Sequence, residues 1–189
     1  MSEDRRIRKT KTSIKSSLID LLKTKPINQI SVTELTSKAD ISRKTFYLHY
    51  NSIFEAKEDI DNDLIQRLKR LISTIISDAH KIEEKNILLF FKQVDASIRE
   101  HKQLVDYFMM NSRQSSLYSK VKHLLKESVL EIVNSDSSDA VYNNYLAEFI
   151  VNGILSTYIE WNNRKRDISD EELNSLLTRL CASVVEMIK

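Results

Sequence analysis

The chain has 189 residues, and its 29 Lys and Arg residues nearly balance its 27 Asp and Glu residues. It contains one Gly, one Pro and one Cys, which excludes Gly-rich phosphate loops and internal disulfides. No apolar run approaches the roughly 20 residues of a membrane span, and no secretory signal peptide is visible. We therefore expect a soluble, cytoplasmic, all-α protein with short polar connections.

The first 50 residues are basic. They hold 11 Lys and Arg residues against 5 Asp and Glu residues, a net charge of +6, whereas residues 51–189 hold 18 against 22, a net of −4. A basic arm is predicted before the first helix: Arg5, Arg6, Arg8, Lys9 and Lys11. The arm is either a solvated terminus or a contact for an anionic partner.

A first helix is predicted from Thr12 to Lys23. Its inward side chains are expected to be Ile14, Leu18, Leu21 and Leu22. The Lys25-Pro26-Ile27 sequence ends this helix, because Pro cannot continue it.

Residues 31–50 predict two short helices joined by a tight turn. Ser31 and Glu34 form a capping box for the first helix, and Ser42 is a second N-cap. In the second helix Phe46 and Tyr50 lie four residues apart and share a face, which we assign to the core with Ile41. The outward side chains are Arg43, Lys44, Thr45, Tyr47 and His49.

This segment resembles the signature of the tetracycline-repressor (TetR/AcrR) family of bacterial transcription regulators, roughly Ala-Gly-Val-Ser-x-x-Thr-x-Tyr-x-x-Phe-x-x-Lys. The matching positions are Ala39, Asp40, Ile41, Ser42, Thr45, Tyr47 and Tyr50. Asp40 replaces the turn Gly, and Ile53 replaces the Lys that contacts phosphate in the family. Lys57 is the nearest substitute for that Lys.

The resemblance implies a helix-turn-helix DNA-binding domain over residues 1–51 and a helical effector-binding and dimerisation domain over residues 52–189. It implies a homodimeric, sequence-specific regulator that binds a palindromic double-stranded DNA operator and, as a repressor, is released by a small apolar effector. The residues matched to DNA contact are Thr33, Ser42, Arg43, Lys44, Thr45, Tyr47, His49 and Lys57.

Beyond the motif, Ser52 and Glu55 open a helix predicted to end near Ser77. Further helices are expected over residues 85–100, 102–111, 116–133, 139–163 and 169–188. Four aromatic residues are candidates for an effector pocket: Phe91, Tyr107, Phe108 and Tyr118. An ordinary core would have the same composition.

The last two helices are apolar over more surface than one small core needs. The spacing from Gly153 to Trp161 and the acidic helix start at Ser169–Glu172 also resemble the C-terminal domains of the TetR/AcrR family. In that family such a helix pair forms the dimer interface. The expected interface residues are Tyr145, Phe149, Gly153, Leu173, Leu177, Leu180 and Val184.

Two other functions are compatible with a helical chain. One is a protein-interaction adaptor with a vestigial DNA-binding head, supported by Asp40 and Ile53 alone. The other is an enzyme, but the four histidines are scattered and no Glu-x-x-His pair suits a di-metal site. We therefore expect no catalytic activity, no metal and no cofactor.

Overall fold

The computed structural model describes residues 2–76, 84–110, 115–133 and 139–186. Within these ranges all regular structure is helical, which confirms the predicted all-α class. The chain divides into two compact units: Met1–Ile65 with Gln103–Met110, and Gln66–Lys102 with Asn111–Lys189. We call them the head and the body.

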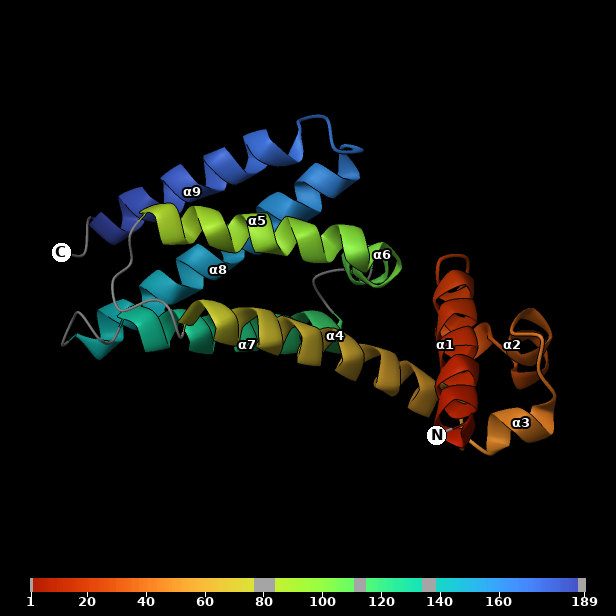
Figure 1. Cartoon of the computed structure of the whole chain (residues 1–189). Coiled ribbons are helices and arrows are strands. Elements are labelled where there is room, and N and C mark those ends of the chain that lie inside the picture. The colour runs from red at the N-terminus through yellow and green to blue at the C-terminus, as the bar shows by residue number, and fades with distance from the viewer. Residues whose placement is uncertain (1, 77–83, 111–114, 134–138, 187–189) are drawn as a thin grey trace. The chain divides into compact units, whose positions relative to one another are not determined.

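The head contains α1 (Ser2–Leu22), a short 3-10 turn (Ile27–Gln29), α2 (Val32–Lys38), α3 (Arg43–Tyr47), the first half of α4 (Ile53–Ile76) and nearly all of α6 (Lys102–Met110). Helix α2 packs against both α1 and α3 (Figure 1). In the core of the head, five large apolar side chains are at most 1% exposed: Ile14, Leu18, Leu35, Phe46 and Ile60.

Helix α1 begins ten residues earlier than the sequence predicts. The basic residues expected in an arm therefore lie on the helix itself, where Thr10 Oγ1 donates to the carbonyl of Arg6 at 3.0 Å. The apolar period that marks the helix starts only at Ile14, because the exposed first turns need no apolar stripe. No Gly or Pro interrupts residues 2–22, so the helix continues through them.

Helix α6 belongs to the head although it is distant from it in sequence. Tyr107 donates to the buried carboxylate of Asp61 on α4 at 2.9 Å, and the amide of Gln103 bonds to both the hydroxyl and the carbonyl of Ser16 on α1. The boundary between the two compact units on α4 therefore lies at Ile65–Gln66, whereas the predicted domain boundary lies at residues 51–52. The division of roles between the two parts stays a prediction.

The body contains the second half of α4 together with α5 (Glu84–Glu100), α7 (Ser116–Val133), α8 (Ala140–Asn163) and α9 (Asp170–Glu186). These bounds agree with the predicted ranges to within one or two residues. Helix α5 packs along α9 and α7 packs along α8 (Figure 1). Five larger apolar residues of the body are at most 2% exposed: Phe91, Leu117, Val151, Leu173 and Leu177.

Local capping explains where α8 and α9 begin. The carboxylate of Asp139 accepts from the first free amides of α8, and Ser169 with Glu172 forms a reciprocal capping box before α9. In the connection between them, Lys165 and Arg166 adopt positive φ angles of 57° and 59°. The predicted linker at residues 134–138 lies outside the described residues.

Among the residues that the structure describes, no helix is both long enough and apolar enough to cross a membrane.

The head core yields a matched test on one helix. Leu18 is fully buried and Leu22 is half-buried. Leu18→Ala should lower the free energy of unfolding by about 2–5 kcal/mol, because it leaves a cavity. Leu22→Ala should cost less than half as much in urea unfolding followed by circular dichroism. Equal losses would show that the assigned core face is wrong.

Candidate nucleic-acid interface

The turn between α2 and α3 has the geometry that the sequence predicts. Ser31 Oγ accepts from the Glu34 amide at 3.1 Å, so the N-cap of α2 is confirmed. At the other end Asp40 adopts a φ of 53°, and the amide of Ile41 donates to the carbonyl of Thr36 at 3.0 Å. This is a Schellman ending, in which Asp40 takes the left-handed position that Gly usually fills.

Helix α3 is short and capped on the predicted residue. Ser42 Oγ accepts from the Thr45 amide at 3.0 Å and lies 2.8 Å from the Thr45 hydroxyl. Phe46 and Tyr50 are buried with ring centroids 5.9 Å apart, as predicted, whereas Ile41 is half-buried. Their burial fixes which face of α3 points outward.

The outward face of α3 is polar and basic. Arg43, Lys44 and Tyr47 are exposed, and Thr33 is exposed at the start of α2. Ser42 is exposed, whereas Thr45 and His49 are half-buried. The helix ends at Tyr47, so His49 lies in the closing turn, where its amide donates to the carbonyl of Phe46.

A polar cluster ties the end of α3 to α1 and α4. Tyr50 donates to the Asp59 carboxylate at 2.6 Å, and Lys15 lies 3.0 Å from the same oxygen. Lys11 lies 3.4 Å from that oxygen and stacks over the Tyr50 ring at 5.0 Å from its centroid. Sequence reasoning missed this cluster, because it assigned Tyr50 to an apolar core.

Lys57 forms an ion pair with another residue of its own helix, α4. Its ammonium lies 2.7 Å from a carboxylate oxygen of the buried Asp61 and 6.0 Å from the Tyr107 ring centroid. Ile53, at the family's Lys position, is buried. Neither residue therefore presents an exposed cation beside α3.

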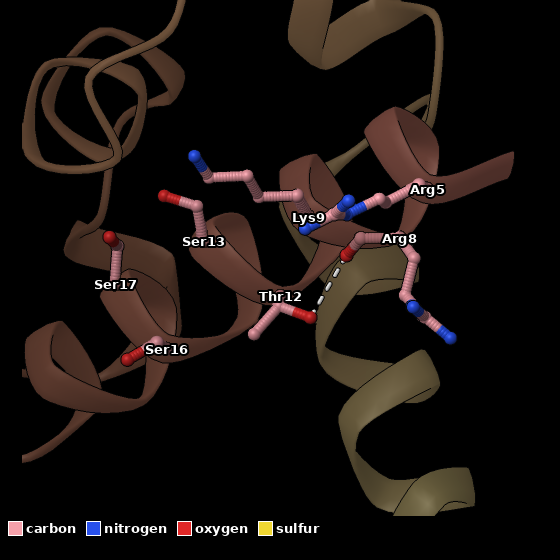
Figure 2. A pocket seen from close by; sticks show the side chains of 7 residues that line it. All are labelled: Arg5, Arg8, Lys9, Thr12, Ser13, Ser16 and Ser17. Carbon is pink, nitrogen blue, oxygen red and sulfur yellow. Dashed lines mark hydrogen bonds between the residues drawn. The ribbon is translucent and has the colours of Figure 1, made fainter. Parts of the chain in front are cut away.

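Exposed cations lie instead on α1. Arg5, Arg8 and Lys9 line an open hollow of about 590 Å³ together with Thr12 and Ser13 (Figure 2). Ser16 and Ser17 complete its lining, and the Thr12 hydroxyl donates to the carbonyl of Arg8 at 2.9 Å. Guanidinium, ammonium and hydroxyl groups on one helix face are the groups that bind phosphate oxygens.

Comparison with known families identifies the body. A TetR family model described as a transcriptional regulator C-terminal region matches residues 85–183, more than half of the chain. The chain belongs to the TetR family of transcriptional regulators. Comparison with curated proteins gave no match.

Solved structures share the fold of this TetR-family chain at low sequence identity. A TetR transcriptional regulator from Streptococcus agalactiae 2603V has 18% identity and a TM-score of 0.64, covering 95% of this chain and 97% of its own. The fatty acid degradation regulator FadR from Bacillus halodurans has 14% identity and a TM-score of 0.65, covering 90% and 93%. A TetR-like transcriptional regulator from Rhodococcus sp. RHA1 has 16% identity and a TM-score of 0.63. The match covers 90% of this chain and 92% of that protein.

The four residues expected to line an effector pocket of the TetR-family body fall in different units. Phe91 and Tyr118 are buried in the body, whereas Tyr107 and Phe108 are buried in the head. The Tyr107 hydroxyl is bonded to Asp61. The assignment of these residues to one pocket stays a prediction.

The residues expected at a TetR-family dimer interface divide into exposed and buried sets. Tyr145 and Phe149 are 75% and 69% exposed, Leu180 is 54% exposed, and Val184 is half-buried. Gly153 is also exposed, and a Cβ added to it would meet no atom within 4 Å. Leu173 and Leu177 are only 1% and 2% exposed, because they face the core of their own unit.

The Asp59 cluster predicts a dependence of head stability on pH. Burial by itself would raise the pKa of Asp59, but the hydrogen bonds from Tyr50 and Lys15 outweigh it and lower the pKa below its usual value. The stabilisation is therefore present above the unfolded pKa of about 4 and is lost as the pH falls through the folded pKa.

Asp59→Asn should cost about 1–3 kcal/mol at neutral pH, and this cost should shrink toward about pH 3 in urea unfolding. Asp63→Asn is the control, because Asp63 is more exposed and bonds to Lys15 alone among these groups. It should cost at most about 1 kcal/mol. A cost for Asp59→Asn that is independent of pH would contradict the account.

Proposed function

We propose that the protein is a cytoplasmic, homodimeric repressor that binds a palindromic DNA operator and is released from it by a small-molecule effector. The observation that carries the proposal is α3, whose caps and buried Phe46 hold Arg43, Lys44 and Tyr47 outward on a basic head. No catalytic step is part of the proposal.

In this proposal α3 reads the major groove. Arg43 contacts base edges, since a guanidinium can bind guanine bidentately, and Lys44 contacts bases or phosphate. The hydroxyls of Thr33, Ser42, Thr45 and Tyr47 bind phosphates and fix the register, with His49 at the end of the helix. Two copies related by the dimer axis would lie one helical turn of DNA apart, about 34–36 Å.

In the family a Lys at the position of Ile53 contacts phosphate. We assign this role to cations on α1. Arg5, Arg8 and Lys9 are exposed and line one hollow, whereas Lys57 is bonded to Asp61. The proposal therefore does not use Lys57 as a DNA contact. The adaptor alternative also loses its support from Asp40, because this residue forms the same turn that Gly would.

The dimer surface is assigned to the exposed apolar side chains of α8 and α9. Val141, Tyr142, Tyr145 and Phe149 are exposed on α8, and Leu176 and Leu180 are exposed on α9. Gly153 continues the α8 stripe one turn beyond Phe149, and a Gly inside a helix costs about 1 kcal/mol relative to Ala. Close approach of a second backbone at Gly153 would offset this cost. Leu180 is kept from the expected set, Leu176 is added to it, and the buried Leu173 and Leu177 are left out of this surface.

DNA affinity tests the role of α3. Arg43→Ala should weaken binding to the duplex that the wild-type protein selects by about 1–3 kcal/mol per half-site. Tyr47→Phe should weaken binding to all sequences alike, because a phosphate contact is lost. Fluorescence anisotropy at a stated salt concentration measures both.

Lys23→Met is the matched control for these variants, because Lys23 is exposed directly after the end of α1 and lies outside the proposed surface. It removes one positive charge from the head but none from the proposed reading face, so affinity should change less than about twofold. Unchanged affinity for Arg43→Ala and Tyr47→Phe would overturn the assignment of α3.

The oligomeric state tests the surface on α8. Phe149→Glu should give a monomer in sedimentation velocity, because a buried, unpaired carboxylate would be costly in an apolar interface. Leu89→Glu on α5 is the control, since Leu89 is also exposed but lies outside the surface. A dimer that tolerates Phe149→Glu would place the interface elsewhere.

A further inference from the structure

Four polar side chains are buried together in the body, on three different helices. Asp95 lies on α5, Tyr158 on α8, and Asn174 and Thr178 on α9. Each is between 3% and 5% exposed. We call these four residues the buried polar cluster.

One hydrogen bond, the helical repeat and an electrostatic effect indicate that these residues share one region. The Asn174 side-chain amide donates to Asp95 Oδ2, and Thr178 follows Asn174 by one helical turn on the same face of α9. Burial first, and then the negative charge of Asp95, raises the pKa of Tyr158. Helix α5 packs along α9 (Figure 1), and Arg99 near the end of α5 lies 3.0 Å from Asp170 at the start of α9.

Each of the four residues has a buried atom without a hydrogen-bond partner. These atoms are Asp95 Oδ1, Tyr158 Oη, Asn174 Oδ1 and Thr178 Oγ1. Buried polar groups are nearly always hydrogen-bonded, and each exception calls for an explanation, such as a bound water or ion. Four such atoms in one region are therefore a candidate binding site.

The chemistry of the four atoms selects the ligand. A carboxylate oxygen and an amide oxygen accept hydrogen bonds, and the two hydroxyls can accept or donate. The nearby cations are engaged elsewhere: Arg99 lies 3.0 Å from Asp170 and Arg166 stacks over Trp161 at 4.8 Å. Burial, only partly offset by the Asn174 hydrogen bond, raises the pKa of Asp95. The site therefore lacks a positively charged donor.

A primary ammonium supplies what the cluster lacks. It has three N–H donors, enough for Asp95 Oδ1, Asn174 Oδ1 and one hydroxyl, and its charge balances the carboxylate. The aromatic ring of Tyr158 adds a favourable surface for a cation.

We propose that Asp95, Tyr158, Asn174 and Thr178 form a binding site for the ammonium group of a small primary amine. As the effector site of a repressor this inference rests on the proposed function, but as a binding site it does not. Binding is therefore measured on the full chain without DNA.

The test is thermal unfolding of the purified full chain with methylammonium or propylammonium chloride at matched ionic strength. Saturating amine should raise the Tm by about 5–10 °C. Tetramethylammonium chloride, which has the same charge but no N–H donor, should leave the Tm unchanged. Asp95→Asn should abolish the response while the helical circular dichroism spectrum is kept, and Thr178→Val should reduce it.

Glu127→Gln on α7 is the control variant, because Glu127 is exposed, and it should respond as the wild type does. The proposal is overturned if no amine raises the Tm, in which case the cluster binds water only. It is also overturned if tetramethylammonium acts equally or if Asp95→Asn responds in full. An amine response in a protein that fails to bind DNA would keep this site and reject the proposed repressor.

Discussion

The bond from Tyr50 to Asp59 is the contact on which the DNA-reading surface depends. Helix α3 has only five residues, too few to be stable alone, so its direction is set by what holds its ends. Ser42 caps the first end, and beyond the second end Tyr50 is tied through Asp59 to Lys15 on α1. Helices α1 and α4 thereby hold α3 in place, and the exposed Arg43 and Lys44 are not needed to hold it.

Two groups of charged residues in the head have different tasks. Lys11, Lys15 and Lys57 lie against Asp59, Asp61 and Asp63 of α4 and hold the head together. Arg5, Arg8 and Lys9, with Arg43 and Lys44, stay exposed. These exposed cations belong to the surface proposed to meet DNA, where positive charge favours fast and salt-dependent association.

Local signals explain what the sequence could predict. Ser31, Ser42 and Ser52 each accept the capping hydrogen bond expected of them, and so these helix starts follow from a few neighbouring residues. The start of α1 was missed because exposed first turns have no apolar period.

Long-range contacts could not be predicted. The hydrogen bond from Tyr107 to Asp61 joins residues 46 apart, which no spacing rule anticipates. On α9 both Leu173 with Leu177 and Leu176 with Leu180 fit a helical period, and only packing shows which pair is exposed. The buried polar cluster could not be predicted either, because its four residues come from three helices that are distant in the sequence.

The central claim is that α3 reads base sequence, and it is tested most directly by selecting binding sites from random DNA. The wild-type dimer should enrich a palindrome with two half-sites about one helical turn apart. Arg43→Gln should enrich a palindrome that differs at one position in each half-site, since Gln pairs with adenine where Arg pairs with guanine. An identical consensus for both proteins, or no enrichment by the wild type, would contradict the claim.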